Sequence, residues 1–355
     1  MADWTTVNYG GQPTSTPTST AQVGGNQQAA SVTSTSTVTI TPSPVVVQPA
    51  AAQNNAAQNN NNAQQGSQNN QGSQNNQGSQ NNNGNNNNNN NNNNGGNTTP
   101  QTTPSNSSPG TKRGLAYDNT SPNMNIFSQY QNKLSWGYNW VSSRGSLPTS
   151  MEYIPMLHST DGTFTGPWSS DVDAAKSAAG GNTLYLMSFN EPDQTGQSNM
   201  SPGAAAAAFG QYMSPHAAGN VKLGAPSVSN GVGNNGAGNP MGIDWLKSFM
   251  GSCSSCPIDF VNIHWYGCDN GCSIDDDVKD FQSQVGKASA IGKPVWVTEF
   301  GAKGDADRQE QFMGQILPWL DGHAGVERYS YFMAKEGILT QGNGVSGLGQ
   351  KYATS

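Results

Sequence analysis

The sequence predicts an α/β protein whose residues 112–355 form a compact (β/α)8 TIM barrel, behind a long N-terminal segment of different composition. Three observations predict this fold. Short apolar segments alternate with helix-like stretches, a pattern typical of a parallel sheet with crossover helices. Eight such segments can be counted. The region is also close in length to the ~250 residues of a typical (β/α)8 barrel.

The N-terminal segment, residues 1–111, is expected to form a disordered stalk. It contains one charged residue, Asp3, whereas all 15 Lys and Arg residues lie beyond it. Residues 12–50 are rich in Ser, Thr and Pro, as in O-glycosylated stalks. A polar tract follows, with QGSQNN repeated three times over 65–82 and an Asn run over 85–94. Such a sequence buries too little apolar surface to offset the entropy of ordering, although Asn-rich tracts can also self-associate in cross-β form.

The barrel region contains the eight candidate strands. Most of them are continuous apolar runs rather than alternating ones, as expected for strands that are buried on both faces. They are RGLAYDN (113–119), KLSWGYNW (133–140), EYIPMLHS (152–159), TLYLMSFNEP (183–192), VKLGAPSVS (221–229), DFVNIHWYG (259–267), PVWVTEFG (294–301) and VERYSYFMA (326–334). A doubly wound open sheet is the alternative, but the first strand is not followed by a Gly-rich phosphate loop.

The expected helices have start signals or one apolar face each. Acids at 275–277 open the connection between the sixth and seventh strands, where they favour the positive end of a helix. Ser201 and Pro202 supply an N-cap and a first helical residue before an Ala run. The helix that starts at 275–277 has an apolar face of Val278, Phe281, Val285 and Ala288. The helix between the seventh and eighth strands has an apolar face of Phe312, Ile316 and Leu320. The connections 120–132 and 141–151 are weak as helices, so we expect one side of the barrel to be trimmed.

The composition excludes several classes of partner. The formal net charge is −7, the sequence pI is about 4.9 and no basic cluster occurs, which excludes nucleic acid and anionic lipid as partners. No stretch reaches the length of a membrane span. The start, MADWTTVNYGG, has no signal-peptide features. We nevertheless expect an extracellular or cell-wall protein, because features such as the Ser/Thr/Pro-rich N-terminal segment are typical of one.

Two glutamates lie where apolar strands end. The fourth strand ends with Asn190-Glu191-Pro192, and the seventh ends with Thr-Glu-Phe-Gly around Glu299. Catalytic groups of (β/α)8 barrels gather at the carboxyl ends of the strands. Two carboxyl groups that face one cavity can divide the cleavage of a glycosidic bond. One, protonated, donates to the leaving oxygen, and the other, ionised, attacks the anomeric carbon. We therefore predict Glu191 and Glu299 as catalytic residues.

These two motifs resemble the clan of retaining (β/α)8 glycosidases that carries its acid/base on strand 4 and its nucleophile on strand 7. More narrowly, residues 112–355 resemble glycoside hydrolase family 128, the fungal alkali-sensitive-linkage-protein-like domain, through RGLAYDN, SWGYNW, YIPMLHS, FNEPD, HWYG and VTEFG in this order. The resemblance implies Glu191 as acid/base, Glu299 as nucleophile and β-1,3-glucan as substrate. It also implies that Asn190 binds a sugar 2-hydroxyl. Related families have an Arg near the end of strand 2, for which Arg144 is the nearest candidate and has no assigned role.

Further binding residues are expected around the two glutamates. His264 and Tyr266 lie on one face of the sixth strand, next to the strand of Glu299. A Tyr266 hydroxyl that donates to Glu299 would keep this carboxylate ionised. For His264, the alternative to a role in the site is a hydrogen-bonded histidine of the core. Glycan clefts also need aromatic floors. The aromatic residues near strand ends are Trp136, Trp140, Trp265, Tyr266, Tyr331 and Phe332. Of these, Trp136 and Phe332 are the expected platforms.

The four cysteines, at 253, 256, 268 and 272, could indicate a zinc site or disulfides. The sixth strand separates the two pairs, and an extended strand of this length spans roughly 25 Å. At this separation the two pairs cannot share one metal ion, and they cannot be linked to each other because bridged Cα atoms lie within about 7 Å. We therefore predict the disulfides Cys253–Cys256 and Cys268–Cys272, which indicate an oxidising compartment.

These features together predict a retaining β-1,3-glucanase of the fungal cell wall that needs no metal or cofactor. We expect the two catalytic carboxyl groups to lie about 5–5.5 Å apart, as in retaining enzymes. We also expect a monomer, with self-association through the Asn-rich tract left open. The alternatives are a non-catalytic glucan-binding protein of the wall, and a glycosidase or transglycosylase that acts on another β-glycan such as β-1,6-glucan. The intact glutamate pair weighs against the binding protein.

Overall fold

The computed structural model describes residues 6–7, 45–46, 112–118, 121, 123–268 and 271–355. Within residues 1–111 it describes two short strands, β1 (Thr6–Val7) and β2 (Val45–Val46), which pair in antiparallel register. The predicted stalk otherwise lies outside the described residues. Its disorder and the domain boundary at residue 112 therefore stay predictions.

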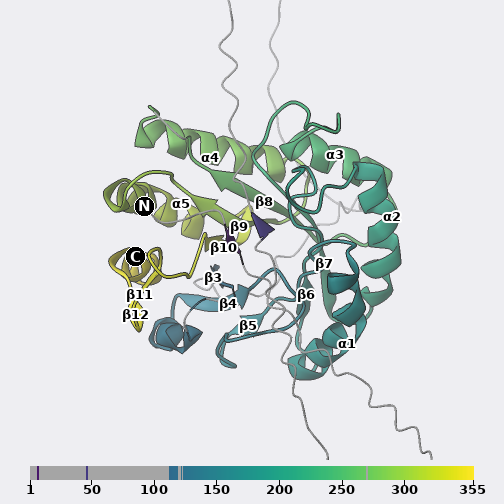
Figure 1. Cartoon of the computed structure of the whole chain (residues 1–355), viewed down its shortest axis with the longest axis horizontal. Coiled ribbons are helices and arrows are strands. Elements are labelled where there is room, and N and C mark those ends of the chain that lie inside the picture. The colour runs from purple at the N-terminus through teal and green to yellow at the C-terminus, as the bar shows by residue number, and fades with distance from the viewer. Residues whose placement is uncertain (1–5, 8–44, 47–111, 119–120, 122, 269–270) are drawn as a thin grey trace, which may run out of the picture. The chain divides into compact units, whose positions relative to one another are not determined.

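The barrel is built from eight parallel strands, and all eight predicted segments are confirmed (Figure 1). Neighbouring strands follow the order β5-β4-β3-β10-β9-β8-β7-β6, in which β3 and β10 bring the start and end of the barrel together. The strands are β3 (Arg113–Ala116), β4 (Leu134–Tyr138), β5 (Glu152–Tyr153), β6 (Leu184–Leu186), β7 (Val221–Val228), β8 (Phe260–Tyr266), β9 (Val295–Gly301) and β10 (Val326–Tyr331).

The sheet closes beyond the short strands β5 and β6. A parallel bridge joins Met156 to Met187. The backbone N–H of Met187 donates to the Pro155 carbonyl at 2.9 Å, and that of Leu157 donates to the Met187 carbonyl at 3.0 Å. The predicted (β/α)8 barrel is therefore confirmed.

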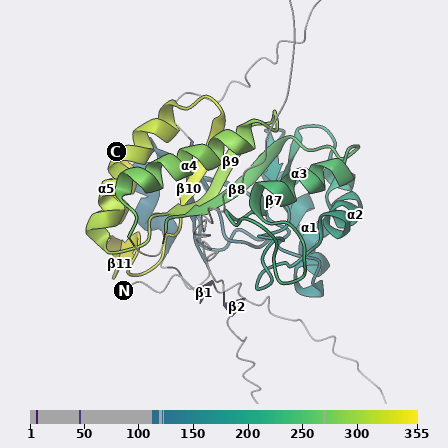
Figure 2. The same ribbon diagram turned by 90° about the horizontal axis from the view of Figure 1, so that it is seen from above.

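Helices cover the sheet on most sides, and their order around the barrel follows the chain (Figures 1 and 2). They are α1 (Gly162–Ala179), α2 (Pro202–Tyr212), α3 (Gly242–Ser252), α4 (Ile274–Ser289), α5 (Ala306–Gly322), α6 (Gly347–Thr354) and the 3-10 helices η1 (Met124–Tyr130) and η2 (Ser214–His216). A small hairpin of β11 (Thr340–Gln341) and β12 (Gly344–Val345) precedes α6. Of the helices in the described residues, none combines the length and apolar character that crossing a membrane needs.

The helix signals in the sequence are confirmed by the caps. The hydroxyl of Ser201 accepts a hydrogen bond from the Ala204 backbone, and Pro202 is the first residue of α2. Ser273 and Asp276 form a capping box at the start of α4, whose predicted apolar face is buried. The expected trimming is also confirmed, because only η1 joins β3 to β4 and the described residues between β4 and β5 contain no helix.

Candidate active site

Glu191 and Glu299 lie together at the carboxyl ends of β6 and β9. Each is only 1% exposed. One carboxylate oxygen of each, together with a ring nitrogen of His264, falls in a cluster whose atoms all lie within 4.8 Å of one another. The structure thus brings the two predicted catalytic residues together with the predicted His264.

The backbone around Glu191 has an unusual conformation that hydrogen bonds hold in place. Glu191 has a φ of 38°, in the left-handed region that few residues other than glycine adopt. Its N–H donates to the Ser227 carbonyl at 2.8 Å. The carbonyl of the preceding Asn190 accepts hydrogen bonds from the hydroxyl of Ser198 at 2.6 Å and from its N–H at 3.2 Å. Such conformations cluster at functional sites, where the surrounding structure enforces them.

Glu299 accepts hydrogen bonds on both of its oxygens. The hydroxyl of Tyr266 donates to Oε2 at 2.5 Å, and the indole Nε1 of Trp140 donates to Oε1 at 2.7 Å. Donors that point at a carboxylate favour its ionised form. The hydrogen bond expected from Tyr266 is therefore present, and Trp140 provides a second one.

His264 links the two glutamates. Its Nδ1 lies 3.0 Å from Oε1 of Glu191 and 3.5 Å from Oε1 of Glu299, while its Nε2 lies 3.0 Å from the hydroxyl oxygen of Thr298. Burial lowers the pKa of His264, although Glu299 and Asp193 act in the opposite direction. Burial therefore favours the neutral form of the ring, while the two carboxyl groups beside it favour the charged form.

The pKa of Glu191 suits an acid. Burial raises this pKa well above its ordinary value, and the carboxylate of Asp193 raises it further. Asp193 is itself fixed by three hydrogen bonds. Oδ1 accepts from the Ser229 N–H at 3.2 Å, while Oδ2 accepts from the Ser229 hydroxyl at 2.5 Å and the Gly242 N–H at 2.8 Å. A fixed negative charge beside Glu191 disfavours its ionisation.

Several groups act on the pKa of Glu299 in opposite directions. Burial raises it, and the neighbouring His264 opposes that effect. Glu191 raises it further, while the hydrogen bonds from Tyr266 and Trp140 lower it. The pKa of both carboxyl groups is thus raised, mainly by burial, but only Glu299 accepts hydrogen bonds from Tyr266 and Trp140 that oppose the rise. Different environments of this kind are how a pair of carboxyl groups can divide into an acid and a nucleophile, as the sequence predicts for Glu191 and Glu299.

Several buried polar atoms beside Glu191 lack a hydrogen-bond partner among the described residues. They are Oε2 of Glu191, Oδ1 of Asn190 and Nε2 of Gln197. Asn190 donates to Gln197 through its Nδ2 at 3.2 Å, so the two amides are neighbours. Buried groups of this kind are normally paired, so a ligand with hydroxyl groups is a fitting partner. Gln197 was not predicted, because it lies in a polar connection without any strand or helix pattern.

The aromatic residues divide into two groups. Phe332 packs edge-on against Trp140, with ring centroids 5.8 Å apart, and against Tyr266, with centroids 5.6 Å apart. Trp136, by contrast, donates through Nε1 to the carbonyl of Lys112, directly before β3, at 2.9 Å. Its indole lies so close to Gly114 that a Cβ there would come within 2.2 Å of it. Trp136 is therefore a core residue, and Trp140 occupies the place expected for it.

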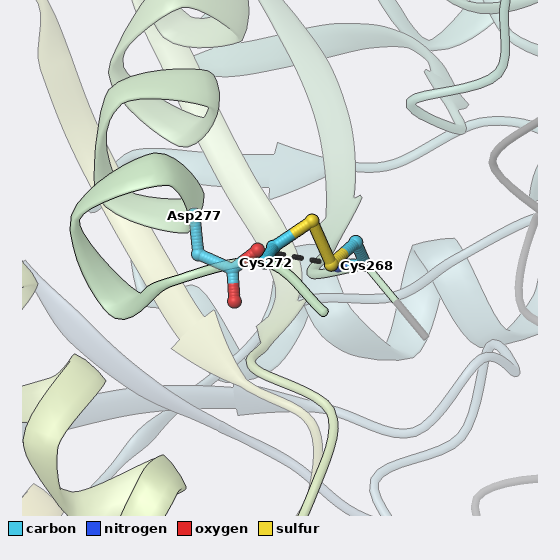
Figure 3. Close-up of side chains that lie close together, drawn as sticks. All are labelled: Cys268, Cys272 and Asp277. Atoms are coloured by element: carbon cyan, nitrogen blue, oxygen red, sulfur yellow. Dashed lines mark hydrogen bonds between the residues drawn. A yellow bond between two sulfur atoms is a disulfide. The ribbon is translucent and has the colours of Figure 1, made fainter. Parts of the chain in front are cut away.

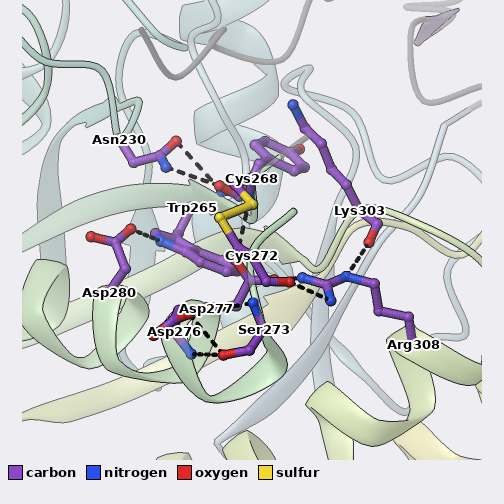
Figure 4. Close-up of a disulfide and its surroundings, with 11 residues drawn as sticks. Asn230, Trp265, Cys268, Cys272, Ser273, Asp276, Asp277, Asp280, Lys303 and Arg308 are labelled. Carbon is purple, nitrogen blue, oxygen red and sulfur yellow. Dashed lines mark hydrogen bonds and ion pairs between the residues drawn. A yellow bond between two sulfur atoms is a disulfide. The ribbon is translucent and has the colours of Figure 1, made fainter. Parts of the chain in front are cut away.

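Both predicted disulfides, Cys253–Cys256 and Cys268–Cys272, are present. The second lies in the connection that follows β8 (Figure 3). The N–H of Cys268 donates to Asp277 at 3.2 Å, and Arg308 donates to the Cys272 carbonyl at 3.0 Å while it forms an ion pair with Asp277 (Figure 4). This network anchors the chain directly after Tyr266, the residue that donates to Glu299.

Two clusters of the described residues have the donor types of a metal site. The first consists of Cys268, Cys272 and Asp277, but its two sulfur atoms form a disulfide and are not thiolates. The second consists of Glu191, His264 and Glu299. Hydrogen bonds already engage both nitrogens of the histidine and both oxygens of Glu299. This arrangement fits a site for acid–base chemistry better than a metal centre.

Residues 114–352 match the glycosyl hydrolase catalytic core family. The chain belongs to this family. It is 31% identical over 267 residues to Alkali-sensitive linkage protein 1 of Schizosaccharomyces pombe, a match that covers 69% of this chain and 45% of that relative. The chain thus spans about half the length of the curated relative that it matches.

Solved structures of glycoside hydrolase family 128 are similar to the barrel. A curdlan-specific exo-β-1,3-glucanase of subgroup III from Blastomyces gilchristii, in complex with glucose, is 39% identical, with a TM-score of 0.58 over 69% of this chain and 98% of that one. A subgroup I endo-β-1,3-glucanase from Amycolatopsis mediterranei, in complex with laminaritriose, is 25% identical, with a TM-score of 0.55 over 69% and 99%. The resemblance to family 128 that the sequence motifs indicated is confirmed.

The hydrogen bond from Tyr266 gives a first prediction. Tyr266→Phe is expected to lower kcat/KM about 10- to 100-fold, because a hydrogen bond to a charged group contributes about 1.5–3 kcal/mol. Loss of the donor raises the pKa of Glu299, the predicted nucleophile, which must be ionised for that role. The acid limb of the pH profile of kcat/KM should therefore move to higher pH.

Tyr331→Phe is the matched control for this experiment. Tyr331 is also a fully buried tyrosine near a strand end, and its hydroxyl donates to Gln309 at 3.0 Å, in the helix layer. Its loss should leave the position of the acid limb unchanged. An equal shift in both variants would mean that Tyr266 has no specific effect on Glu299.

Proposed function

We propose that this protein is a retaining glycoside hydrolase that cleaves β-1,3-glucan. The observation that carries the proposal is the buried pair of Glu191 and Glu299, whose clustered oxygens lie within 4.8 Å and whose hydrogen bonds differ. Retaining enzymes hold their two carboxyl groups about 5–5.5 Å apart, whereas inverting enzymes leave about 6.5–9.5 Å for a water molecule. The two β-1,3-glucanases of family 128 described above support the choice of substrate.

The proposed reaction has two steps. Ionised Glu299 attacks the anomeric carbon, while protonated Glu191 donates its proton to the departing glycosidic oxygen, so that a glycosyl-enzyme ester forms. Glu191, now ionised, then removes a proton from water, which attacks the same carbon and releases Glu299. His264, which lies beside both carboxyl groups, keeps them oriented through both steps.

The groups that line the site suit a sugar ring. The unpartnered atoms of Asn190 and Gln197 are expected to bind hydroxyl groups, with Asn190 at the 2-hydroxyl. Phe332 packs edge-on against Trp140, whose indole donates to Glu299, so these two rings are the aromatic residues that we propose contact the sugar. We place the protein outside the cell, in the wall, and the two disulfides support an oxidising compartment.

Product stereochemistry tests this proposal. Wild-type protein with a panel of defined β-glucans should hydrolyse β-1,3-linked substrates best, and proton NMR should detect the β-anomer of the new reducing end first. Initial release of the α-anomer would contradict retention. Preference for a β-1,6-linked substrate would favour the alternative glycan, and binding without any hydrolysis would favour a wall glucan-binding protein.

The pH profile is a second expected outcome. Glu191 acts when protonated, so activity falls as the pH rises through its pKa, and Glu299 acts when ionised, so activity falls as the pH drops below its pKa. Burial raises the pKa of Glu191 well above its ordinary value, which keeps it protonated over the range in which Glu299 is ionised. We expect a bell-shaped profile with a mildly acidic optimum, and loss of the alkaline limb in Glu191→Gln. An alkaline limb that persists in this variant would belong to another group.

A further inference from the structure

A covalent link joins the two ends of the connection that follows Tyr266. The Cys268–Cys272 disulfide lies between β8 and α4, and Cys268 stands two residues after Tyr266, the last residue of β8 (Figure 3). Both cysteines are half-buried, so a small thiol in solution can reach the bond. The hydroxyl of Tyr266 donates to Glu299 at 2.5 Å. The disulfide therefore lies close in the chain to a group that acts on a predicted catalytic carboxylate.

The backbone between Tyr266 and the disulfide is held by its neighbours on both sides. The Gly267 N–H donates to the carbonyl of Gly301, the last residue of β9, at 3.0 Å. The Cys268 N–H donates to Oδ1 of Asp277 in α4 at 3.2 Å. Asp277 also packs so closely on Gly267 that a Cβ there would come within 2.9 Å of its Oδ2. The end of β8 is therefore fixed between β9 and α4.

The other end of the disulfide joins a network that reaches the strand of Glu299. Arg308 of α5 donates to the Cys272 carbonyl at 3.0 Å and to the Lys303 carbonyl at 2.8 Å. It also forms an ion pair with Asp277 (Figure 4). Lys303 lies in the connection that follows β9, which carries Glu299. The disulfide thus connects this network to the backbone that carries the donor of Glu299.

The disulfide is the covalent part of this arrangement. Without it, a single hydrogen bond of 3.2 Å to Asp277 joins half-buried Cys268 to α4. A cross-link restrains the chain at all times, whereas one hydrogen bond in contact with water opens readily. The contact between Tyr266 and Glu299 tolerates little movement of the strand end, since a displacement of about 1 Å can lower a rate by a factor on the order of 10². Loss of the disulfide should therefore weaken this hydrogen bond.

We propose that the Cys268–Cys272 disulfide is a positioning element of the active site, which holds the Tyr266 hydroxyl on Glu299 and makes the activity sensitive to dithiol reductants. The role of Glu299 in this proposal rests on the proposed function. A thiolate of the reductant attacks one sulfur of the disulfide, and its second thiol then releases the protein sulfur from the mixed disulfide. The dithiol gives two electrons and two protons and becomes a disulfide, while Cys268 and Cys272 become thiols. The protein is thereby fully active only where its disulfides are kept oxidised, as outside the cell.

The groups around Glu299 give the direction of the effect. Tyr266 and His264 face Glu299 from β8, Trp140 faces it from the connection after β4, and Glu191 faces it from the end of β6. The hydrogen bond from Tyr266 lowers the pKa of Glu299. Its loss therefore raises this pKa, and Glu299 becomes ionised only at higher pH. The acid limb of the pH profile of kcat/KM should move in the same direction.

Reduction does not act through a change of charge. The charged side chains around the disulfide come from α4, α5 and the connection after β9 (Figure 4), and they are Asp276, Asp277, Asp280, Arg308 and Lys303. None of them is created or removed when the disulfide is reduced. Cysteine thiols have an ordinary pKa of about 8.5, so they are uncharged in acidic solution. The redox state therefore acts on Glu299 through the position of Tyr266.

The second disulfide, Cys253–Cys256, is a matched control in the same chain. It closes a loop of similar length, with a sequence separation of 3 instead of 4. It lies between α3 and β8, at the amino end of the strand whose carboxyl end carries Tyr266. The sulfur of Cys253 contacts the Ala206 carbonyl of α2 at 3.9 Å, in the helix layer. Its loss should affect stability without affecting Glu299.

The test compares pH profiles of kcat/KM on a soluble β-1,3-glucan oligosaccharide, in the full-length protein. The variants are Cys268→Ser/Cys272→Ser, Cys253→Ser/Cys256→Ser, Tyr266→Phe, and the first combined with the third. Thermal unfolding checks that each variant is folded. Cys253→Ser/Cys256→Ser, which keeps one disulfide, is also measured after reduction with dithiothreitol and again after reoxidation. Alkylation and mass spectrometry identify the sulfurs that reacted.

Removal of Cys268–Cys272, by substitution or by reduction, should lower kcat/KM about 10-fold and move the acid limb to higher pH, as Tyr266→Phe does. Reoxidation should restore both. In Tyr266→Phe the same removal should cause no further shift of the acid limb, because both changes act on one hydrogen bond. Removal of Cys253–Cys256 should leave the acid limb in place.

Four results would overturn the inference. One is an unchanged acid limb without Cys268–Cys272, and another is an equal shift without Cys253–Cys256. A third is a full additional shift in the Tyr266→Phe background. The fourth is a disulfide that dithiothreitol leaves intact in the folded protein. If Cys268→Ser/Cys272→Ser did not fold, the reduction experiment decides, and unfolding on reduction would assign this disulfide to stability alone.

Failure of the proposed function would appear differently, as absence of β-1,3-glucan hydrolysis by the wild-type protein. The position of Tyr266 can then still be followed through the ¹³C signal of the Glu299 carboxyl group, which is assigned by its loss in Glu299→Gln. Titration of this signal should move to higher pH when Cys268–Cys272 is reduced. Intact hydrolysis with a titration that does not move would remove the inference and leave the proposed function in place.

Discussion

Glu299→Gln is expected to lower kcat on β-1,3-glucan by a factor on the order of 10⁴ to 10⁶, the size of effect that loss of a covalent nucleophile has in other hydrolases. The amide of Gln has nearly the shape of the carboxylate but no negative charge with which to attack. Tyr266 and Trp140 donate to the two oxygens of Glu299, and a Gln can accept only at one of them. The glycosyl-enzyme intermediate therefore cannot form, and its absence can be followed by mass spectrometry with a slow fluorinated substrate.

Glu327→Gln is a matched control. Glu327 lies in β10 and also accepts a hydrogen bond from an indole, that of Trp296, at 2.9 Å. It lies near the amino end of its strand, away from the catalytic end of the barrel. Loss of its charge should change kcat by less than about 10-fold. If Glu299→Gln still accumulated a covalent intermediate, another residue would be the nucleophile.

Much of the fold, and the approach of Glu191 to Glu299, could be predicted, because both depend on short-range sequence signals. A strand buried on both faces needs a continuous apolar run, and a glutamate at the end of such a run is conspicuous. The two disulfides could be predicted because β8 separates their pairs. The weak helix signals at 120–132 and 141–151 correctly indicated the trimmed side.

The contacts that orient the site could not be predicted, because they depend on the path of the backbone. Trp136 and Trp140 are both aromatic residues near the end of the second strand, and the sequence does not show which of them reaches the cavity. Trp140 has a φ of 60°, outside the regular strand conformation, and this turns its indole toward Glu299. Gln197 likewise reaches Asn190 through a connection that has no periodic pattern. Residues of this kind are determined by loop geometry.

Glu191→Ala is expected to have a large effect that depends on the leaving group. On β-1,3-glucan, whose leaving group is a sugar alcohol, kcat/KM should fall about 10²- to 10⁴-fold, the range of general acid catalysis. On an aryl β-glucoside with a dinitrophenolate leaving group, formation of the intermediate should be nearly unchanged, because that oxygen departs without a proton. Its hydrolysis should be slow, since no base remains to activate water, and a burst of phenolate should therefore precede slow turnover.

Azide separates the role of Glu191 from that of Glu299. In Glu191→Ala the missing side chain leaves space and removes a negative charge, so azide can attack the glycosyl-enzyme from the side that water would use. The product should be a β-glycosyl azide, and turnover of the activated substrate should increase with azide concentration.

In Glu299→Ala no glycosyl-enzyme forms, so azide can attack only the substrate itself, from the opposite side, and would give the α-azide. A β-azide from Glu299→Ala and an α-azide from Glu191→Ala would reverse the two assignments. The raised pKa of Glu191 and the donors around Glu299 predict the first pattern.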